Sequence, residues 1–150
     1  TASTGEKELG FNNLMKKLQL SLIGGFFATV FLLLVIGVED MTGILSFDTP
    51  KFLIEWSGGI IWVEWLIHLF SGWLFAIIYS FLFIKILEWI PSNIFRGAVY
   101  GLLIAILLQI IMFMTDSEIM ENNLLVASAG MAIAYIAYGA VLGMIVTGKK

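Results

Sequence analysis

The stretch EWLIHLFSGWLFAIIYS, residues Glu64–Ser80, decides the fold class of this chain. It is almost wholly apolar and contains the only histidine in the sequence. Residues four apart lie on one slanting face of a helix, and a stripe with this spacing runs through the segment. The stripe has ionisable side chains at its N-terminal end and small side chains elsewhere, and its residues are Glu64, His68, Gly72, Ala76 and Ser80. An apolar helix with such a face is typical of a packed membrane span.

The composition extends this interpretation to the whole chain. Of 150 residues, 60% are hydrophobic and 13% are charged, whereas soluble domains are roughly one quarter charged. Four apolar runs approach the length of about 20 residues that a helix needs to cross the hydrocarbon core. They are residues 18–38, 60–87, 94–114 and 124–146. Backbone groups in lipid must be satisfied internally, so we predict an all-α membrane protein, a single antiparallel four-helix bundle over residues 1–150.

Basic residues predict the orientation of the bundle. With four spans, the eight Lys and Arg residues all fall on one side except Lys51. Positive charge accumulates in cytoplasmic loops, so both termini are expected to be cytoplasmic, in a multi-pass protein of the bacterial cytoplasmic (inner) membrane. The first outer loop contains TPKFLIEW, with Thr49 at an N-cap position and Pro50 at a first helical position. A short interfacial helix and a solvated loop both fit this segment.

Several functional classes are disfavoured. The chain has no cysteine and one histidine, so thiol chemistry is excluded and a metal site within one chain is not expected. A net charge of −3 provides no basic face for nucleic acid. No phosphate-binding loop, HExxH motif or nucleophile elbow is present. We therefore expect neither a cofactor nor catalytic activity, and the expected partners are membrane lipids, a second copy of the chain or another membrane protein.

Small residues predict how the spans pack. In the run 94–114, residues Gly97, Gly101 and Ala105 repeat at a spacing of four, and Gly72 and Ala76 do the same in the run 60–87. Such stripes let helix backbones approach closely. Since a short turn joins these two runs, we expect the two stripes to pack against each other. A subunit interface is the alternative use of these surfaces.

Polar residues at similar depth predict a pocket. His68 lies about 25 Å from Lys85 along a helix, and Gln109 lies roughly 20 Å from Arg96, so both reach the outer part of the hydrocarbon core. Glu39 ends the first run and Glu64 precedes His68 by one turn. We expect an outward-facing polar pocket made of Glu39, Glu64, His68 and Gln109. Glu64 and His68 sharing a proton is one hypothesis, and a structural His68–Gln109 hydrogen bond is the other.

Two functions from different classes follow from this pocket. The first is proton-sensitive permeation or sensing, because an ionisable residue within a membrane is by default a functional candidate. The inner half of the spans offers few polar side chains, so permeation would require an oligomer. The second is a structural or accessory membrane subunit that binds lipid or a partner protein. An enzyme acting on lipid is a third and weaker hypothesis.

Three stretches of the chain resemble a known family. They are Gly24-x12-Gly37-x-Glu39, His68-x6-Phe75-Ala76-x2-Tyr79 and Gly101-Leu-Leu-x-Ala105-x-Leu-x-Gln109. Together they resemble the YagU-like family of bacterial inner-membrane proteins, whose function is largely uncharacterised. Phe113 and Met131 stand where the resemblance leads us to expect further histidines, so a multi-histidine site is not implied. The resemblance directs attention to Glu39, His68 and Gln109, and it does not extend to Glu64.

Overall fold

The structure is a computed structural model that describes residues 4–42, 58–115 and 124–146, and every regular element in these ranges is helical. The elements are α1 (Thr4–Met41), α3 (Ile61–Ile78), the π-helical turn η1 (Tyr79–Phe83), α4 (Ile84–Ile86), α5 (Asn93–Thr115) and α6 (Leu124–Ile145). Four segments are long and apolar enough to cross a membrane: Glu8–Glu39, Trp65–Ile86, Asn93–Met114 and Ser128–Ile145. The protein is therefore a small multi-pass membrane protein, and the predicted all-helical, four-span fold class is confirmed.

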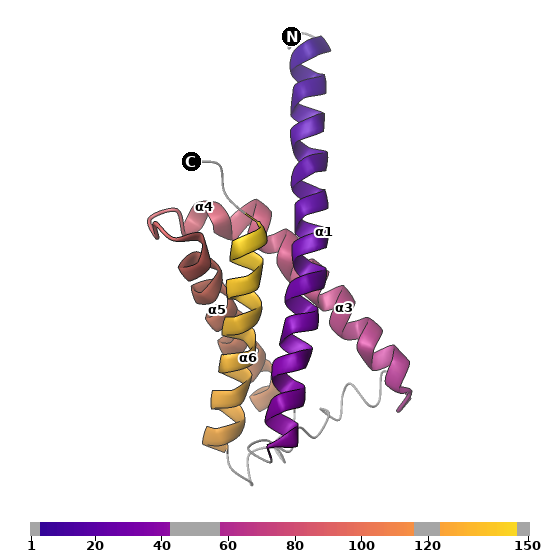
Figure 1. Cartoon of the computed structure of the whole chain (residues 1–150), viewed down its shortest axis with the longest axis vertical. Coiled ribbons are helices and arrows are strands. Elements are labelled where there is room, and N and C mark those ends of the chain that lie inside the picture. The colour runs from indigo at the N-terminus through magenta and orange to yellow at the C-terminus, as the bar shows by residue number, and fades with distance from the viewer. Residues whose placement is uncertain (1–3, 43–57, 116–123, 147–150) are drawn as a thin grey trace.

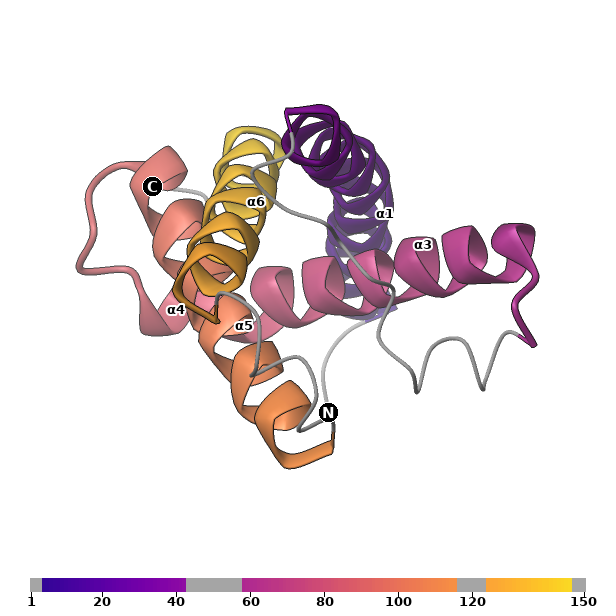
Figure 2. The same ribbon diagram turned by 90° about the horizontal axis from the view of Figure 1, so that it is seen from below.

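The helices form an asymmetric bundle (Figure 1). α5 and α6 pack together along much of their length, while α1 lies between α6 and α3. α1 begins and α6 ends on the same side of the bundle, and the first turns of α1 project well beyond the other helices (Figure 1). Seen along the bundle, α3 runs outward and away from α5 and α6 (Figure 2). Successive spans are thus not all neighbours, because α3 is anchored mainly on α1.

Glycine makes the contact between α5 and α6 unusually close. A Cβ atom added to Gly97 would overlap the backbone carbonyl oxygen of Gly139, and one added to Gly101 would overlap the carbonyl oxygen of Tyr135. Gly143 in turn lies directly against the carbonyl of Asn93. Backbones meet here without intervening side chains, which is how helices in lipid gain packing energy without a hydrophobic driving force. Ala105, the last small residue of this stripe, is fully buried.

The small stripe of α3 packs on α1, so the prediction that it would seat against the run 94–114 is wrong. Gly72 lies against the side chain of Thr29, and Ala76 is fully buried with its Cβ beside Gly25. One turn further along, the hydroxyls of Ser21 and Ser80 form a hydrogen bond of 2.6 Å. Gly25 leaves no side chain between the two backbones, and α3 therefore crosses α1 closely at this point.

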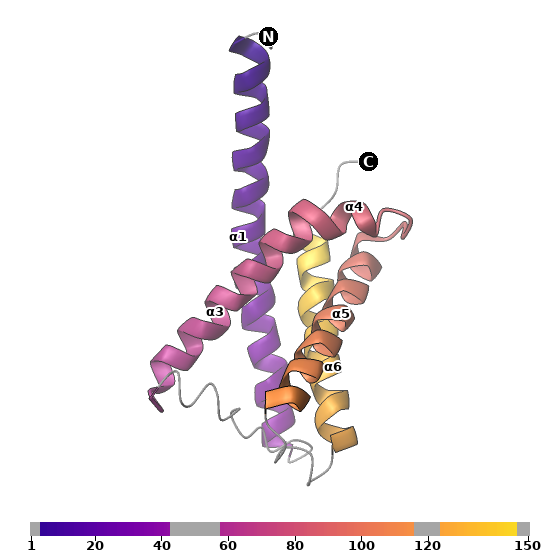
Figure 3. The same cartoon turned by 180° about the vertical axis from the view of Figure 1, so that it is seen from behind.

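The second span is not one uninterrupted α-helix. Between α3 and α4 the chain forms η1, whose residues Tyr79 and Ser80 are buried. The backbone N–H at Tyr79 is shared between the carbonyls of Phe75 and Ala76, as occurs where helical hydrogen bonding changes register. π-helical turns bend helices, and in Figure 3 the oblique α3 leads into an α4 that runs across the end of the bundle. The short turn to α5 follows.

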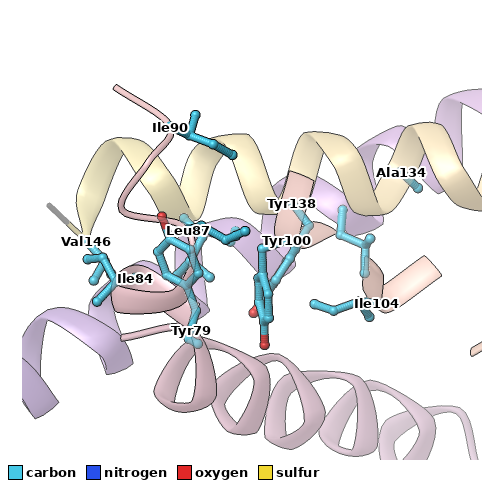
Figure 4. Packing of buried hydrophobic residues seen from close by; sticks show 13 residues of the cluster. Tyr79, Ile84, Leu87, Ile90, Tyr100, Ile104, Ala134, Tyr138 and Val146 are labelled. Atoms are coloured by element: carbon cyan, nitrogen blue, oxygen red, sulfur yellow. The ribbon is translucent and has the colours of Figure 1, made fainter. Parts of the chain in front are cut away.

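A buried cluster joins the helices on the side of α4 (Figure 4). The rings of Tyr79 and Tyr100 lie 5.1 Å apart, and the ring of Phe83 lies 4.7 Å from that of Tyr100. Aliphatic side chains fill the space around them: Ile84, Leu87, Ile90, Leu142 and Val146. The hydroxyl of Tyr100 donates to the carbonyl of Phe75 at 2.7 Å, which ties α5 to α3. The segment 49–56, for which an interfacial helix was considered, lies outside the described residues.

Candidate functional site: a pocket around His68

His68 lies at a small pocket where α1, α3 and α6 come together. The pocket is lined by two apolar side chains, one glycine and five residues with polar side chains: Leu32, Phe75, Gly72, Thr29, His68, Ser71, Tyr135 and Tyr138. Its volume, about 10 Å³, corresponds to the space needed by one water molecule. Each lining residue belongs to one of the membrane spans. The structure thus gathers polar groups within an otherwise apolar bundle.

Hydrogen bonds to backbone carbonyls fix the hydroxyl groups of the pocket. Thr29 donates to the carbonyl of Gly25 at 2.7 Å, and Ser71 donates to the carbonyl of Ile67. Both bonds run to the preceding turn of the residue's own helix, as Ser and Thr commonly bond in helices. A hydroxyl that donates in this way still has lone pairs that can accept a hydrogen bond. The pocket therefore offers acceptors in fixed positions.

Tyr138 lines the pocket and bonds α6 to α3. Its side chain is buried, and its hydroxyl donates to the carbonyl of Gly72 at 2.6 Å across the space between α6 and α3. Tyr135 lines the pocket one turn earlier on α6, with its ring 6.3 Å from that of Tyr138. Figure 4 shows Tyr138 and Tyr100 extending from their helices into the same core. Tyr138 thus belongs both to the lining of the pocket and to the buried cluster.

The predicted polar pocket has a different membership in the structure. Gln109 does not line the pocket of His68, because its amide donates to the carbonyl of Ser128 at 2.9 Å and joins α5 to α6. Glu39 lies near the end of α1 and is not a lining residue either, although one of its carboxylate oxygens is buried. The side chain of Glu64 lies outside the described residues. Of the three predicted residues whose side chains the structure describes, only His68 lines the pocket. α3 diverges from α5 on this side, which separates His68 from Gln109.

The other polar residues of the pocket carried only weak signals in the sequence. Ser71 follows His68 by three residues, which places both on one helical face. Tyr135 and Tyr138 have the same spacing on α6. Thr29 follows Gly25 by one turn, but nothing in the sequence indicates that Gly72 would meet it. Spacing identifies a shared face within one helix, whereas the partner helix depends on packing.

Arg96 has a structural role that the sequence does not indicate. In the sequence it counted only as one of the basic residues that predict the orientation of the bundle. Its side chain is buried, and its guanidinium donates to the carbonyls of Leu87, Glu88 and Ile90 at 3.0, 3.3 and 2.7 Å. These carbonyls belong to the turn between α4 and α5, where the carbonyl of Leu87 also accepts from the backbone N–H of Ile90 at 3.0 Å. A planar guanidinium with five donors suits this geometry. Arg96 therefore holds the turn in place rather than serving a ligand.

The donor set of the pocket does not suit a metal ion. Within the described parts of the chain, no group of three His, Asp or Glu residues comes together in a metal-binding arrangement. The polar groups at the pocket are one imidazole and several hydroxyls, which are suited to hydrogen bonding and proton exchange.

Comparison with known proteins places the chain in a family. Residues 15–148 match the Family of unknown function (DUF6789). The chain belongs to this family. The match includes all of α3, α5 and α6, most of α1 and every residue that lines the pocket. No curated protein and no solved structure matches the chain.

Proposed function

We propose that this DUF6789 protein is a proton-sensitive membrane sensor whose titrating group is His68. The observation that carries the proposal is the placement of the one imidazole at a pocket of fixed hydroxyl groups inside the bundle. Histidine is the side chain whose ordinary pKa permits a change of charge between pH 5 and 8. A positive charge in a mostly apolar pocket requires water or acceptors around it. Protonation would therefore favour a more open arrangement of the pocket.

α3 is the element expected to move. It packs along α1, and its links to α5 and α6 are made chiefly by long side chains, through the hydroxyls of Tyr100 and Tyr138. Two hydrogen bonds are easier to rearrange than the interlocked backbones of α5 and α6. The π-helical turn η1 lies between the pocket-lining part of α3 and the turn held by Arg96. Such turns are frequent at functional positions and at bends in helices.

The packing beneath the pocket supports sensing rather than permeation through one chain. Tyr79, Tyr100 and Tyr138 are buried there, together with Ile84 and Leu142. The hydroxyls of Tyr100 and Tyr138 donate to backbone carbonyls, so neither could pass a proton onward without breaking its hydrogen bond. Permeation would need an additional path between subunits. The resemblance of three spans to the YagU-like family includes His68, and it also supports a functional role for this residue.

A titration of His68 tests this proposal. Because the chain has a single histidine, imidazole labelled with ¹⁵N reports one site in lipid nanodiscs. The proposal predicts a titration between pH 5 and 8 that is accompanied by a change in the signals of Tyr135 and Tyr138. Liposomes containing the protein should show no proton flux above that of empty liposomes. An imidazole that keeps one protonation state from pH 5 to 8, or flux that His68→Ala abolishes, would contradict it.

A second function, a structural or accessory membrane subunit, is favoured by a separate observation. The projecting N-terminal part of α1 carries exposed apolar side chains at Leu9, Phe11 and Leu14. Such a surface is typical of contact with a partner or with lipid. Stoichiometric capture of a partner protein that is lost on Phe11→Ser, with the His68 titration unchanged, would support this function.

A further inference from the structure

We propose that Lys17 and Lys85 form a binding site for the phosphate headgroup of an anionic membrane phospholipid, at the end of the bundle where α4 lies. The site is separate from the pocket of His68 and does not depend on the proposed sensing. Lys17 comes from α1 and Lys85 comes from α4, so two distant parts of the chain contribute one cation each. The ammonium group of Lys17 lies 4.7 Å from the ring centre of Phe81, and Lys85 follows Phe81 by four residues, so both lysines lie at the same end of the bundle.

The position of Lys17 is set by an aromatic ring. Its ammonium nitrogen lies 4.7 Å from the centre of the ring of Phe81, within the range of a cation–π interaction. This contact holds Lys17 on the side of α1 that faces η1 and α4. Adjacent Lys16 is exposed and makes no such contact. The structure thus distinguishes two neighbouring lysines, of which Lys17 contacts the ring of Phe81.

Hydrogen bonds beneath the two lysines make the site rigid. Ser21 lies one turn from Lys17 and donates at 2.8 Å to its carbonyl, and the same hydroxyl bonds Ser80 at 2.6 Å. Ser80 is the residue before Phe81, so this contact fixes the separation of α1 and η1 directly below the cations. Both serines are fully buried. Because the site is already rigid, ligand binding costs little conformational entropy, and this favours a higher affinity.

Among the described residues, no carboxylate neutralises the two cations. In the part of the protein that the structure describes, neither Lys17 nor Lys85 forms an ion pair with a carboxylate. Two like charges held together on a rigid support are stabilised by a shared anion. Phosphate groups are the anions available at the membrane surface, and anionic lipids are bound by basic residues next to membrane spans.

The depth of the site agrees with a lipid headgroup. The helix rise places Lys17 about 33 Å from Glu39, close to the thickness of the hydrocarbon core, roughly 30 Å. Lys17 therefore lies at the level where the hydrocarbon ends. Trp89, near Lys85 in the chain, is exposed, as tryptophans at the interface are. Exposed apolar side chains such as Leu82 and Ile86 adjoin the site and can contact the acyl chains.

Native mass spectrometry of the full chain in detergent tests the proposal, with phosphatidylglycerol and phosphatidylcholine of identical acyl chains as probes. We expect the wild type to retain phosphatidylglycerol preferentially. Lys17→Gln and Lys85→Gln should each weaken its apparent affinity about fivefold, while Lys16→Gln leaves it unchanged. Lys17→Arg and Lys85→Arg should preserve the binding. Lys85 is exposed, so its variants keep the test valid even if a Lys17 variant does not fold.

Three outcomes would overturn the proposal. One is equal retention of the two lipids by the wild type. The second is an equal loss of affinity in the Lys16, Lys17 and Lys85 variants, which would indicate general surface charge. The third is displacement of phosphatidylglycerol by millimolar glycerol phosphate, which would indicate a site for soluble phosphate rather than for lipid.

Discussion

The hydroxyl of Tyr138 on α6 donates to the carbonyl of Gly72 on α3 at 2.6 Å, and both residues line the pocket around His68. Hydrogen bonds between membrane helices contribute about 0.6 kcal/mol on average and up to roughly 2 kcal/mol. We expect Tyr138→Phe to lower the free energy of unfolding by about 1 kcal/mol. Steric trapping in lipid bicelles measures this value.

Tyr79→Phe is the matched control for this prediction. Tyr79 is as deeply buried as Tyr138, but its hydroxyl has no hydrogen-bond partner in the described structure. Removing a buried hydroxyl without a partner costs nothing and relieves its desolvation. The free energy of unfolding should stay the same or rise. A loss in Tyr79→Phe as large as that in Tyr138→Phe would contradict the assignment of the stabilising bond to Tyr138.

The glycine contact between α5 and α6 should tolerate no added methyl group. In Gly101→Ala the new Cβ would meet the carbonyl oxygen of Tyr135, so the two backbones must separate. Overpacking of this kind costs about 1–3 kcal/mol, and we expect a loss of unfolding free energy in that range. Gly37→Ala is the control, because no atom lies within 4 Å of a Cβ added there. Equal stability of the Gly101 and Gly37 variants would show that the helices do not meet as described.

Arg96 should be irreplaceable by lysine. The guanidinium bonds three carbonyls of the turn between α4 and α5, and one ammonium group cannot reach all three. Arg96→Lys keeps the charge, yet we expect it to lower the free energy of unfolding by about 2 kcal/mol. Limited proteolysis after Lys85 or at the mutated position should also become faster. Wild-type stability and wild-type resistance of Arg96→Lys would mean that charge alone matters.

Hydropathy was sufficient to locate the four spans, but helix pairing was not predictable from the same residues. Every span has small residues at a spacing of four, so a stripe identifies a packing face without identifying its partner. The prediction that Gly72 and Ala76 pack against α5 is therefore wrong, because these residues contact α1. The interruption of the second span at η1 likewise has no signal from glycine or proline in YSFLF. It accompanies the bond between Ser80 and Ser21, which is a tertiary contact.

The polar site was predicted only in part, again because the sequence does not show which helices pair. Depth along a helix follows from counting residues, and it places His68 and Gln109 at similar levels. Lateral position depends on the crossing of the helices. Because α3 diverges from α5, Gln109 bonds the backbone of α6 at Ser128, and His68 instead shares a pocket with Thr29 and Ser71. Tyr135 and Tyr138 complete that pocket.

The most direct test of the proposed sensing is the distance between α3 and α5 as a function of pH. The chain has no cysteine, so spin labels can be introduced at exposed Leu66 on α3 and Leu107 on α5 without removing native thiols. Double electron–electron resonance in nanodiscs at pH 8 and pH 5 then reports the separation. We predict a distance distribution that shifts to longer values at pH 5 and no shift in His68→Ala. Identical distributions at both pH values in the wild-type background, or the same shift in His68→Ala, would contradict the account.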